Sequence, residues 1–141
     1  MKPGWWVLAT LSMQACARPG AGTAISVGGT YQTAVTMLES TCSDMGVQQH
    51  PTVVAHQAGD RVLTVTHAGA TYQGILQTNG HFTTPSNTFT IGDVTYAITL
   101  AGRFTTTAVD IRADVAAGRQ PPCHVAARWS GPKDGPANVL P

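Results

Sequence analysis

The sequence predicts an all-β fold, an antiparallel meander of about eight short strands that closes into an up-and-down barrel. Three observations support this prediction. Apolar residues recur at every second position, threonine (20 residues) and glycine (15 residues) are abundant, and short turns rich in Gly, Asn and Asp separate the alternating stretches. Because each strand has one apolar face, the sheet must curl on itself or form a β-sandwich, which is the alternative fold.

The composition favours a single domain and argues against two classes of protein. A chain of 141 residues suits one domain, and its apolar share of 43% excludes a disordered chain. Only 11% of the residues are charged and the net charge is +1, so the basic excess of a nucleic-acid-binding protein is missing. We therefore expect no nucleic-acid partner.

Four strands are predicted in the first half of the chain. The first begins at Thr30 and ends before the segment CSDMGVQQHP, and its inward residues are Tyr31, Thr33, Val35 and Met37. The next three cover 52–57, 61–67 and 71–78, and an Ala-Gly-Asp turn joins the first two of them. The Asn79-Gly80 pair that follows is the strongest signal for a two-residue hairpin in the chain.

The second half continues the meander with a hairpin that turns at Gly92-Asp93. Its second arm alternates cleanly, with these residues inward: Val94, Tyr96, Ile98, Leu100, Gly102 and Phe104. Further strands are predicted over 108–115 and 123–129. The barrel domain is therefore expected over 29–131, followed by an irregular, proline-containing tail over 132–141.

Residues 1–15 have the three parts of a signal peptide. Lys2 gives a positive charge, an apolar stretch of about nine residues follows, and a small residue precedes Cys16. The apolar stretch is too short to remain as a membrane-spanning helix. The segment MQAC (13–16) is similar to a bacterial lipobox, in which the cysteine receives a lipid. This similarity implies a lipid on Cys16 and an extracytoplasmic lipoprotein anchored to a membrane. The small, Gly- and Pro-containing, nearly uncharged residues that follow predict a flexible tether over 16–28.

Two other interpretations of the N-terminus stay open. The segment ACA at 15–17 fits cleavage by ordinary signal peptidase, which would remove Cys16 and release a soluble periplasmic or secreted protein. The third interpretation is an N-terminus that is not cleaved.

Cysteine parity predicts a disulfide between Cys42 and Cys123. Three cysteines in an exported protein leave one unpaired, and these two remain once Cys16 is acylated or removed. The bridge would close a loop of about 80 residues and stabilise the fold by about 4.5 kcal/mol in the chain-entropy model. It would join the end of the first strand to the start of the last, which are neighbours in a closed barrel. Two buried free thiols are the alternative.

Several short motifs resemble a loosely defined group of small bacterial secreted or lipid-anchored β-domains. The motifs are G-T-Y at 29–31, Y-Q-G at 72–74 before an Asn-Gly turn, and G-R-F at 102–104 before a closing strand that holds Cys and Trp. The nearest well-understood architecture is the lipocalin/avidin type of barrel. The resemblance implies a barrel-like fold and no defined activity. An avidin-like biotin site needs several tryptophans, and only Trp129 remains after signal removal, so biotin binding is not expected.

No convergent catalytic or metal-binding set is evident in the sequence. The histidines lack the spacings of zinc ligands and are predicted to face solvent: His50, His56, His67, His81 and His124. Asp110 and Asp114 share a strand face with Arg112 between them, which favours a solvated face over acid–base catalysis. No G-x-S-x-G elbow or Gly-rich phosphate loop occurs. The sequence therefore predicts a protein that is not an enzyme and has no metal or cofactor.

The aromatic residues of the inward set allow two interpretations. In the favoured one they fill the interior, and in the other they line a pocket for a small ligand, as in barrels of about eight strands. The candidate ligand-lining residues are Tyr31, Tyr72, Tyr96, Phe104 and Trp129.

The predicted function is a binding or structural role for a lipid-anchored extracytoplasmic β-barrel, for example as an accessory subunit of a membrane or envelope complex. Its expected partners are the membrane, through the lipid on Cys16, and a protein of such a complex. The broad neutral Thr/Ala faces of the strands suit docking. The alternative function is a lipocalin-like carrier of a small apolar ligand.

Overall fold

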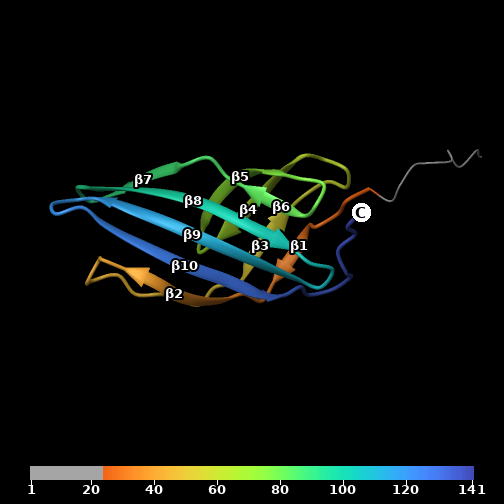
Figure 1. Ribbon diagram of the computed structural model, residues 1–141, viewed down its shortest axis with the longest axis horizontal. Helices are drawn as coiled ribbons and strands as arrows, with labels where there is room; N and C mark the ends of the chain where they lie inside the picture. The colour runs from red at the N-terminus through yellow and green to blue at the C-terminus, as the bar shows by residue number, and fades with distance from the viewer. Residues whose placement is uncertain (1–23) are drawn as a thin grey trace, which may run out of the picture.

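In the computed structural model, which describes residues 24–141, an antiparallel β-sheet curls into a half-barrel (Figure 1). The predicted all-β class is confirmed, since no helix occurs in these residues. The strands are β1 (Gly29–Tyr31), β2 (Ala34–Ser40), β3 (Thr52–Ala55), β4 (Val62–His67), β5 (Ala70–Leu76), β6 (His81–Thr83), β7 (Asn87–Ile91), β8 (Val94–Phe104), β9 (Ala108–Gly118) and β10 (Cys123–Pro132). The part of the chain that the structure describes thus holds no helix able to cross a membrane.

The predicted first strand is divided into two strands with different partners. The order of the sheet is β1-β3-β4-β5-β6-β8-β9-β10-β2, with β7 paired to β8 beside this path. β1 therefore lies at one end of the sheet and β2 at the other, although only Gln32 and Thr33 separate them. The Gln32 amide donates to the Pro132 carbonyl and Tyr31 forms a bridge with Lys133. The two ends of the meander thus meet where the chain changes partner.

Gly131 permits this close approach. A Cβ atom at this position would overlap the carbonyl oxygen of Gln32 and lie 2.8 Å from Cα of Thr33. Both contacts are with backbone, which cannot rotate away as a side chain does. Only glycine therefore fits where β10 crosses the point at which β1 ends and β2 begins.

The buried residues follow the predicted alternation. In β8 the buried side chains are Ile98, Leu100 and Phe104, and in β9 Val109, Ile111 and Ala113 face the same core. Aromatic rings occupy the centre, with Tyr31, Phe82 and Phe104 each at most 1% exposed. The interior between β1, β3–β6 and the adjoining halves of β8–β10 is a continuous apolar cluster.

The turn at Asn79-Gly80 is longer than the sequence suggests. Gln77 and His81 are hydrogen-bonded across it, so the loop holds three residues, and the Gly80 amide donates to the Gln77 carbonyl. Gly80 has a φ of 83°, whereas Asn79 does not adopt a positive φ. The two-residue hairpin predicted here is therefore wrong, because one left-handed residue fits a three-residue loop and a two-residue Asn-Gly turn needs two.

Both ends of the described chain are packed on the barrel. Val27 is fully buried and Ser26 pairs with Val139, so the folded domain begins before the predicted boundary at residue 29. The tail after β10 contains no further strand, but its Asn138 is 3% exposed and accepts a hydrogen bond from the Tyr31 hydroxyl. The predicted signal peptide (1–15) and Cys16 lie outside the described residues.

Candidate functional site

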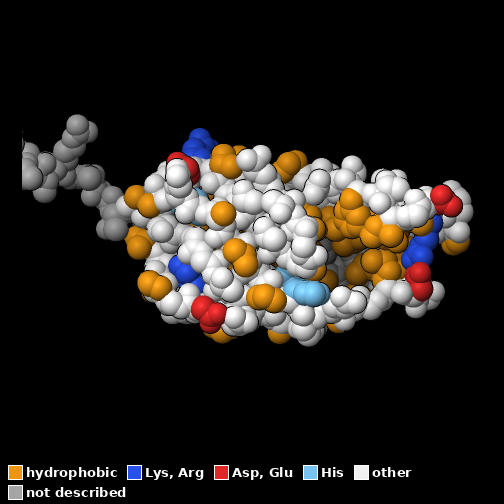
Figure 2. Space-filling model, turned by 180° about the vertical axis from the view of Figure 1, so that it is seen from behind, with side chains coloured by type: hydrophobic (Ala, Val, Ile, Leu, Met, Phe, Trp, Pro, Cys, Tyr) orange, Lys and Arg blue, Asp and Glu red, His pale blue; other side chains and the backbone are white. Residues whose placement is uncertain are grey.

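An apolar groove lies where the long strands extend beyond the packed core. β8, β9 and β10 run the length of the molecule, and only β2 and β7 flank them at the end away from β1 (Figure 1). The concave face there is hollowed by a groove of about 470 Å³. Figure 2 shows this hollow, surrounded by hydrophobic side chains, with a histidine at the inner end.

Two alanines form the floor of the groove. Ala113 of β9 and Ala127 of β10 are directly paired, and both line the hollow. Their methyl groups leave space that a larger side chain would fill. Along the same strands Val115 is paired with Val125, and the Cys42–Cys123 cluster follows, so the groove runs parallel to the strands.

Three elements supply the walls. One wall comes from β2 and the loop over 41–51, and the other comes from β7. The apolar wall residues are Met37, Met45, Val47, Phe89 and Ile91. Val47 and Ile91 are 40% and 64% exposed, so this wall offers apolar surface that a ligand could bury.

The side chain of Gln49 holds the 41–51 loop against the free edge of β2. Its Oε1 accepts from the Val35 amide at 2.8 Å, and its Nε2 donates to the Val35 carbonyl at 2.9 Å. These are the two hydrogen bonds that a neighbouring strand would make with Val35. The loop that forms the wall is therefore attached to the sheet through a side chain.

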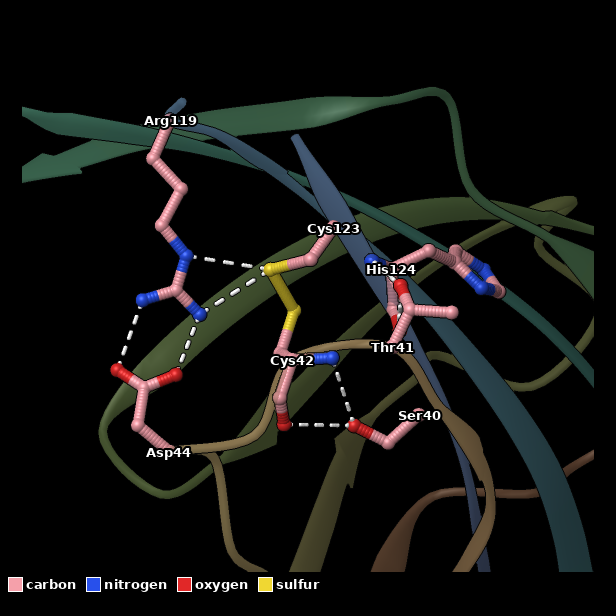
Figure 3. A network of polar contacts seen from close by, with 7 residues as sticks. All are labelled: Ser40, Thr41, Cys42, Asp44, Arg119, Cys123 and His124. Atoms are coloured by element: carbon pink, nitrogen blue, oxygen red, sulfur yellow. Dashed lines mark hydrogen bonds and ion pairs between the residues drawn. A yellow bond between two sulfur atoms is a disulfide. The ribbon is translucent and has the colours of Figure 1, made fainter. Parts of the chain in front are cut away.

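A disulfide and an ion pair fix the outer end of the same loop (Figure 3). The predicted bond between Cys42 and Cys123 is present, with a Cα–Cα distance of 5.1 Å. Arg119 donates from Nε to the Cys123 sulfur at 3.2 Å and from Nη1 to the Asp44 carboxylate at 2.7 Å. The guanidinium lowers the pKa of the Asp44 carboxyl. The loop is thus anchored at both ends.

His67 forms the polar inner end of the groove. The prediction that this histidine faces solvent is wrong. Only 6% of this residue is accessible to solvent, since its ring stacks on Trp129 with centroids 3.8 Å apart. Nδ1 of His67 is 2.9 Å from the Thr52 hydroxyl. Burial, with a smaller contribution from His50, lowers the pKa of His67 to about 4. The ring is therefore neutral at neutral pH.

The structure separates the five aromatic residues predicted to line a ligand pocket. Trp129 lies at the groove. Tyr31, Tyr72 and Phe104 are in the packed core, each at most 4% exposed, and Tyr96 stacks on Phe89 at the β7–β8 hairpin. The favoured prediction, in which these aromatic residues fill the interior, holds for the three core residues, whereas the hollow arises where small residues replace large ones.

The other polar candidates lie on the outer surface. Arg112 contacts Glu39 and Asp114, and Arg128 contacts Asp110, all with largely exposed side chains. Ion pairs of this kind add little to stability. Within residues 24–141 no three side chains are grouped in a way that fits a metal ion.

Comparison with models of known protein families, with curated proteins and with solved structures finds no match for this chain. The resemblance to small exported β-domains stays a prediction.

Proposed function

We propose that this protein is an exported binding protein that carries a small apolar ligand in the groove on the concave face of β8–β10. The observation that supports this function is the hollow of about 470 Å³ with apolar floor and walls. Binding sites for small molecules are typically concave, largely apolar and about 300–1,000 Å³ in volume. The proposal takes up the carrier interpretation of the sequence, with a site at one end of the barrel in place of its filled centre.

Burial of apolar surface provides the driving force for binding. Contact between a ligand and the groove removes apolar area from water on both sides, at roughly 25 cal/mol per Å². The anchored 41–51 loop keeps the wall in place before the ligand arrives, because the disulfide and Gln49 both restrain it. A preformed site loses less conformational entropy when it binds.

The disulfide also supports the proposed location outside the cytoplasm. Such bonds persist in oxidising compartments and are rare in the cytosol. Together with the lipobox-like segment at Cys16, this favours a membrane-anchored lipoprotein, with a soluble exported form as the alternative. An accessory role in a membrane or envelope complex is compatible with ligand binding.

A charge in the middle of the groove is expected to weaken ligand binding strongly. Val115 lines the groove and is half-buried on β9, so Val115→Glu places a carboxylate where the ligand lies. The affinity for the neutral fluorescent probe N-phenyl-1-naphthylamine should fall at least about tenfold, because the carboxylate must be desolvated. Probe fluorescence during titration measures the affinity.

The matched control is Ala116→Glu, which adds the same charge at the next residue, on the exposed outer side of the strand. Its affinity for the probe should equal that of the wild-type protein. Equal losses in both variants, or no probe binding to the wild-type protein, would rule out the groove as the ligand site.

The lipid anchor has its own test. In cells given a labelled fatty acid, the wild-type protein should incorporate label and partition with membranes, whereas Cys16→Ser should do neither. Cys42→Ser is the control and should still incorporate the label, because Cys42 is not the residue that receives the lipid. Label retained by Cys16→Ser would remove the lipoprotein assignment and leave the soluble exported form.

A further inference from the structure

A chain of hydrogen bonds determines which nitrogen of His67 carries the proton. The hydroxyl of Thr33 lies 3.0 Å from the His50 carbonyl oxygen, which can only accept, so Thr33 uses its single proton there. The Thr52 hydroxyl, 2.7 Å away, must then donate to Thr33. With its proton committed, Thr52 can only accept at 2.9 Å from Nδ1 of His67. Nδ1 therefore carries the proton, and Nε2 presents a lone pair.

Nε2 of His67 is the unpaired acceptor at the inner end of the groove. The hydrogen bond of this ring runs through Nδ1, and this contact with Thr52 determines which edge of the ring faces the core while the ring stacks on Trp129. In the described residues no fully buried side-chain nitrogen or oxygen lacks a partner, so Nε2 is not sealed within the core. Since His67 is 94% buried and lines the groove, this nitrogen is reached from the groove.

The groove offers no charge that complements an ionised ligand. Its lining includes no Lys, Arg, Asp or Glu, and its polar side chains are Gln48, His50, His67 and Trp129, whose indole nitrogen carries a donor. Burial keeps His67 neutral, since it lowers the pKa of this side chain to about 4. An ionised carboxylate can only accept hydrogen bonds, as Nε2 does, so the two groups would repel each other. A hydroxyl or an amide N–H would instead donate a hydrogen bond to Nε2. An acceptor left unpaired in such a site lowers affinity.

We infer that the ligand is a neutral amphiphile, an alkyl chain whose single uncharged head group donates a hydrogen bond to Nε2 of His67. The alkyl chain then lies over Ala113 and Ala127 toward Val115. It runs between the wall formed by β2 and the 41–51 loop and the wall formed by β7. This inference rests on the proposed function and adds the class of ligand. Long-chain alcohols represent the class, and ionised fatty acids are excluded from it.

Three compounds of equal chain length separate these features. Dodecan-1-ol can donate a hydrogen bond, methyl dodecyl ether can only accept one, and dodecanoate carries a charge at pH 7.5. In competition against N-phenyl-1-naphthylamine, the alcohol should bind about tenfold more tightly than either the ether or the carboxylate. In His67→Phe, which keeps a ring beside Trp129 and removes Nε2, the ratio of alcohol to ether affinity should fall to about one.

Failure of the inference and failure of the proposed function give different results. Equal affinity for alcohol and ether in the wild-type protein, or a preference for dodecanoate, overturns the inference while ligand binding stands. Absence of probe binding overturns both. A second measurement needs no variant: ¹⁵N chemical shifts of the imidazole should show the proton on Nδ1 of His67, and a proton on Nε2 would contradict the assignment.

Discussion

Removal of the disulfide by the double substitution Cys42→Ala and Cys123→Ala is expected to lower the free energy of unfolding by about 4.5 kcal/mol. The two cysteines are 81 residues apart, so the bridge restricts most of the unfolded chain. Urea denaturation of the wild-type protein and the variant measures the difference. Reductant should destabilise the wild-type protein by the same amount and leave the variant unchanged.

The same change is expected to weaken ligand binding. Cys42 precedes the loop that carries Met45 and Val47 of the groove wall, and the bond attaches this loop to β10. Without it the loop keeps the hydrogen bonds of Gln49 and His50 at one end and of Thr41 at the other, together with the Asp44–Arg119 ion pair. Under conditions where the variant is still folded, its probe affinity should therefore be lower than that of the wild-type protein.

A variant with unchanged stability would show that the bond does not restrain the unfolded chain.

Stability is expected to fall by about 3 kcal/mol between pH 6.5 and pH 4 because of His67 alone. The pKa of this side chain is lowered from 6.5 to about 4 in the folded protein. Between these values the unfolded chain binds a proton that the folded protein does not. The contribution of His67 is therefore fully present above pH 6.5 and is lost as the pH falls toward the folded pKa. Urea denaturation over this pH range measures the slope.

The comparison with His67→Gln isolates this contribution from that of the carboxyl groups. The variant should have a shallower decline of stability below pH 6.5, whatever its stability at neutral pH. His81→Gln, at an exposed position on β6, serves as the control and should keep the wild-type slope. Parallel slopes for wild type and His67→Gln would mean that His67 is protonated as easily in the folded protein as in the unfolded chain.

The alternation of apolar residues was enough to predict most of the fold, because burial on one face acts on every strand alike. The Cys42–Cys123 bond could also be predicted, since parity left these two cysteines together. The division of the first strand could not. Tyr31, Thr33 and Val35 keep one uninterrupted period, and the change of partner depends on Gly131 a hundred residues away.

The groove escaped prediction for a related reason. Ala113 and Ala127 fit the inward alternation as well as larger residues do, and only their pairing in neighbouring strands makes a hollow. His67 likewise continues an alternating strand, and its burial depends on Trp129 stacking from β10. Pairs of small inward residues at matching positions of adjacent strands are the signal that would have indicated this site.

A methyl NMR titration with dodecan-1-ol tests most directly whether this groove binds the ligand. The account predicts saturable shifts at Met37, Met45 and Val115, which line the groove. It predicts none at Val62 and Ile75, an opposed and exposed apolar pair on the outer face of β4 and β5. Shifts confined to that outer pair, or no saturable shifts at all, would contradict it.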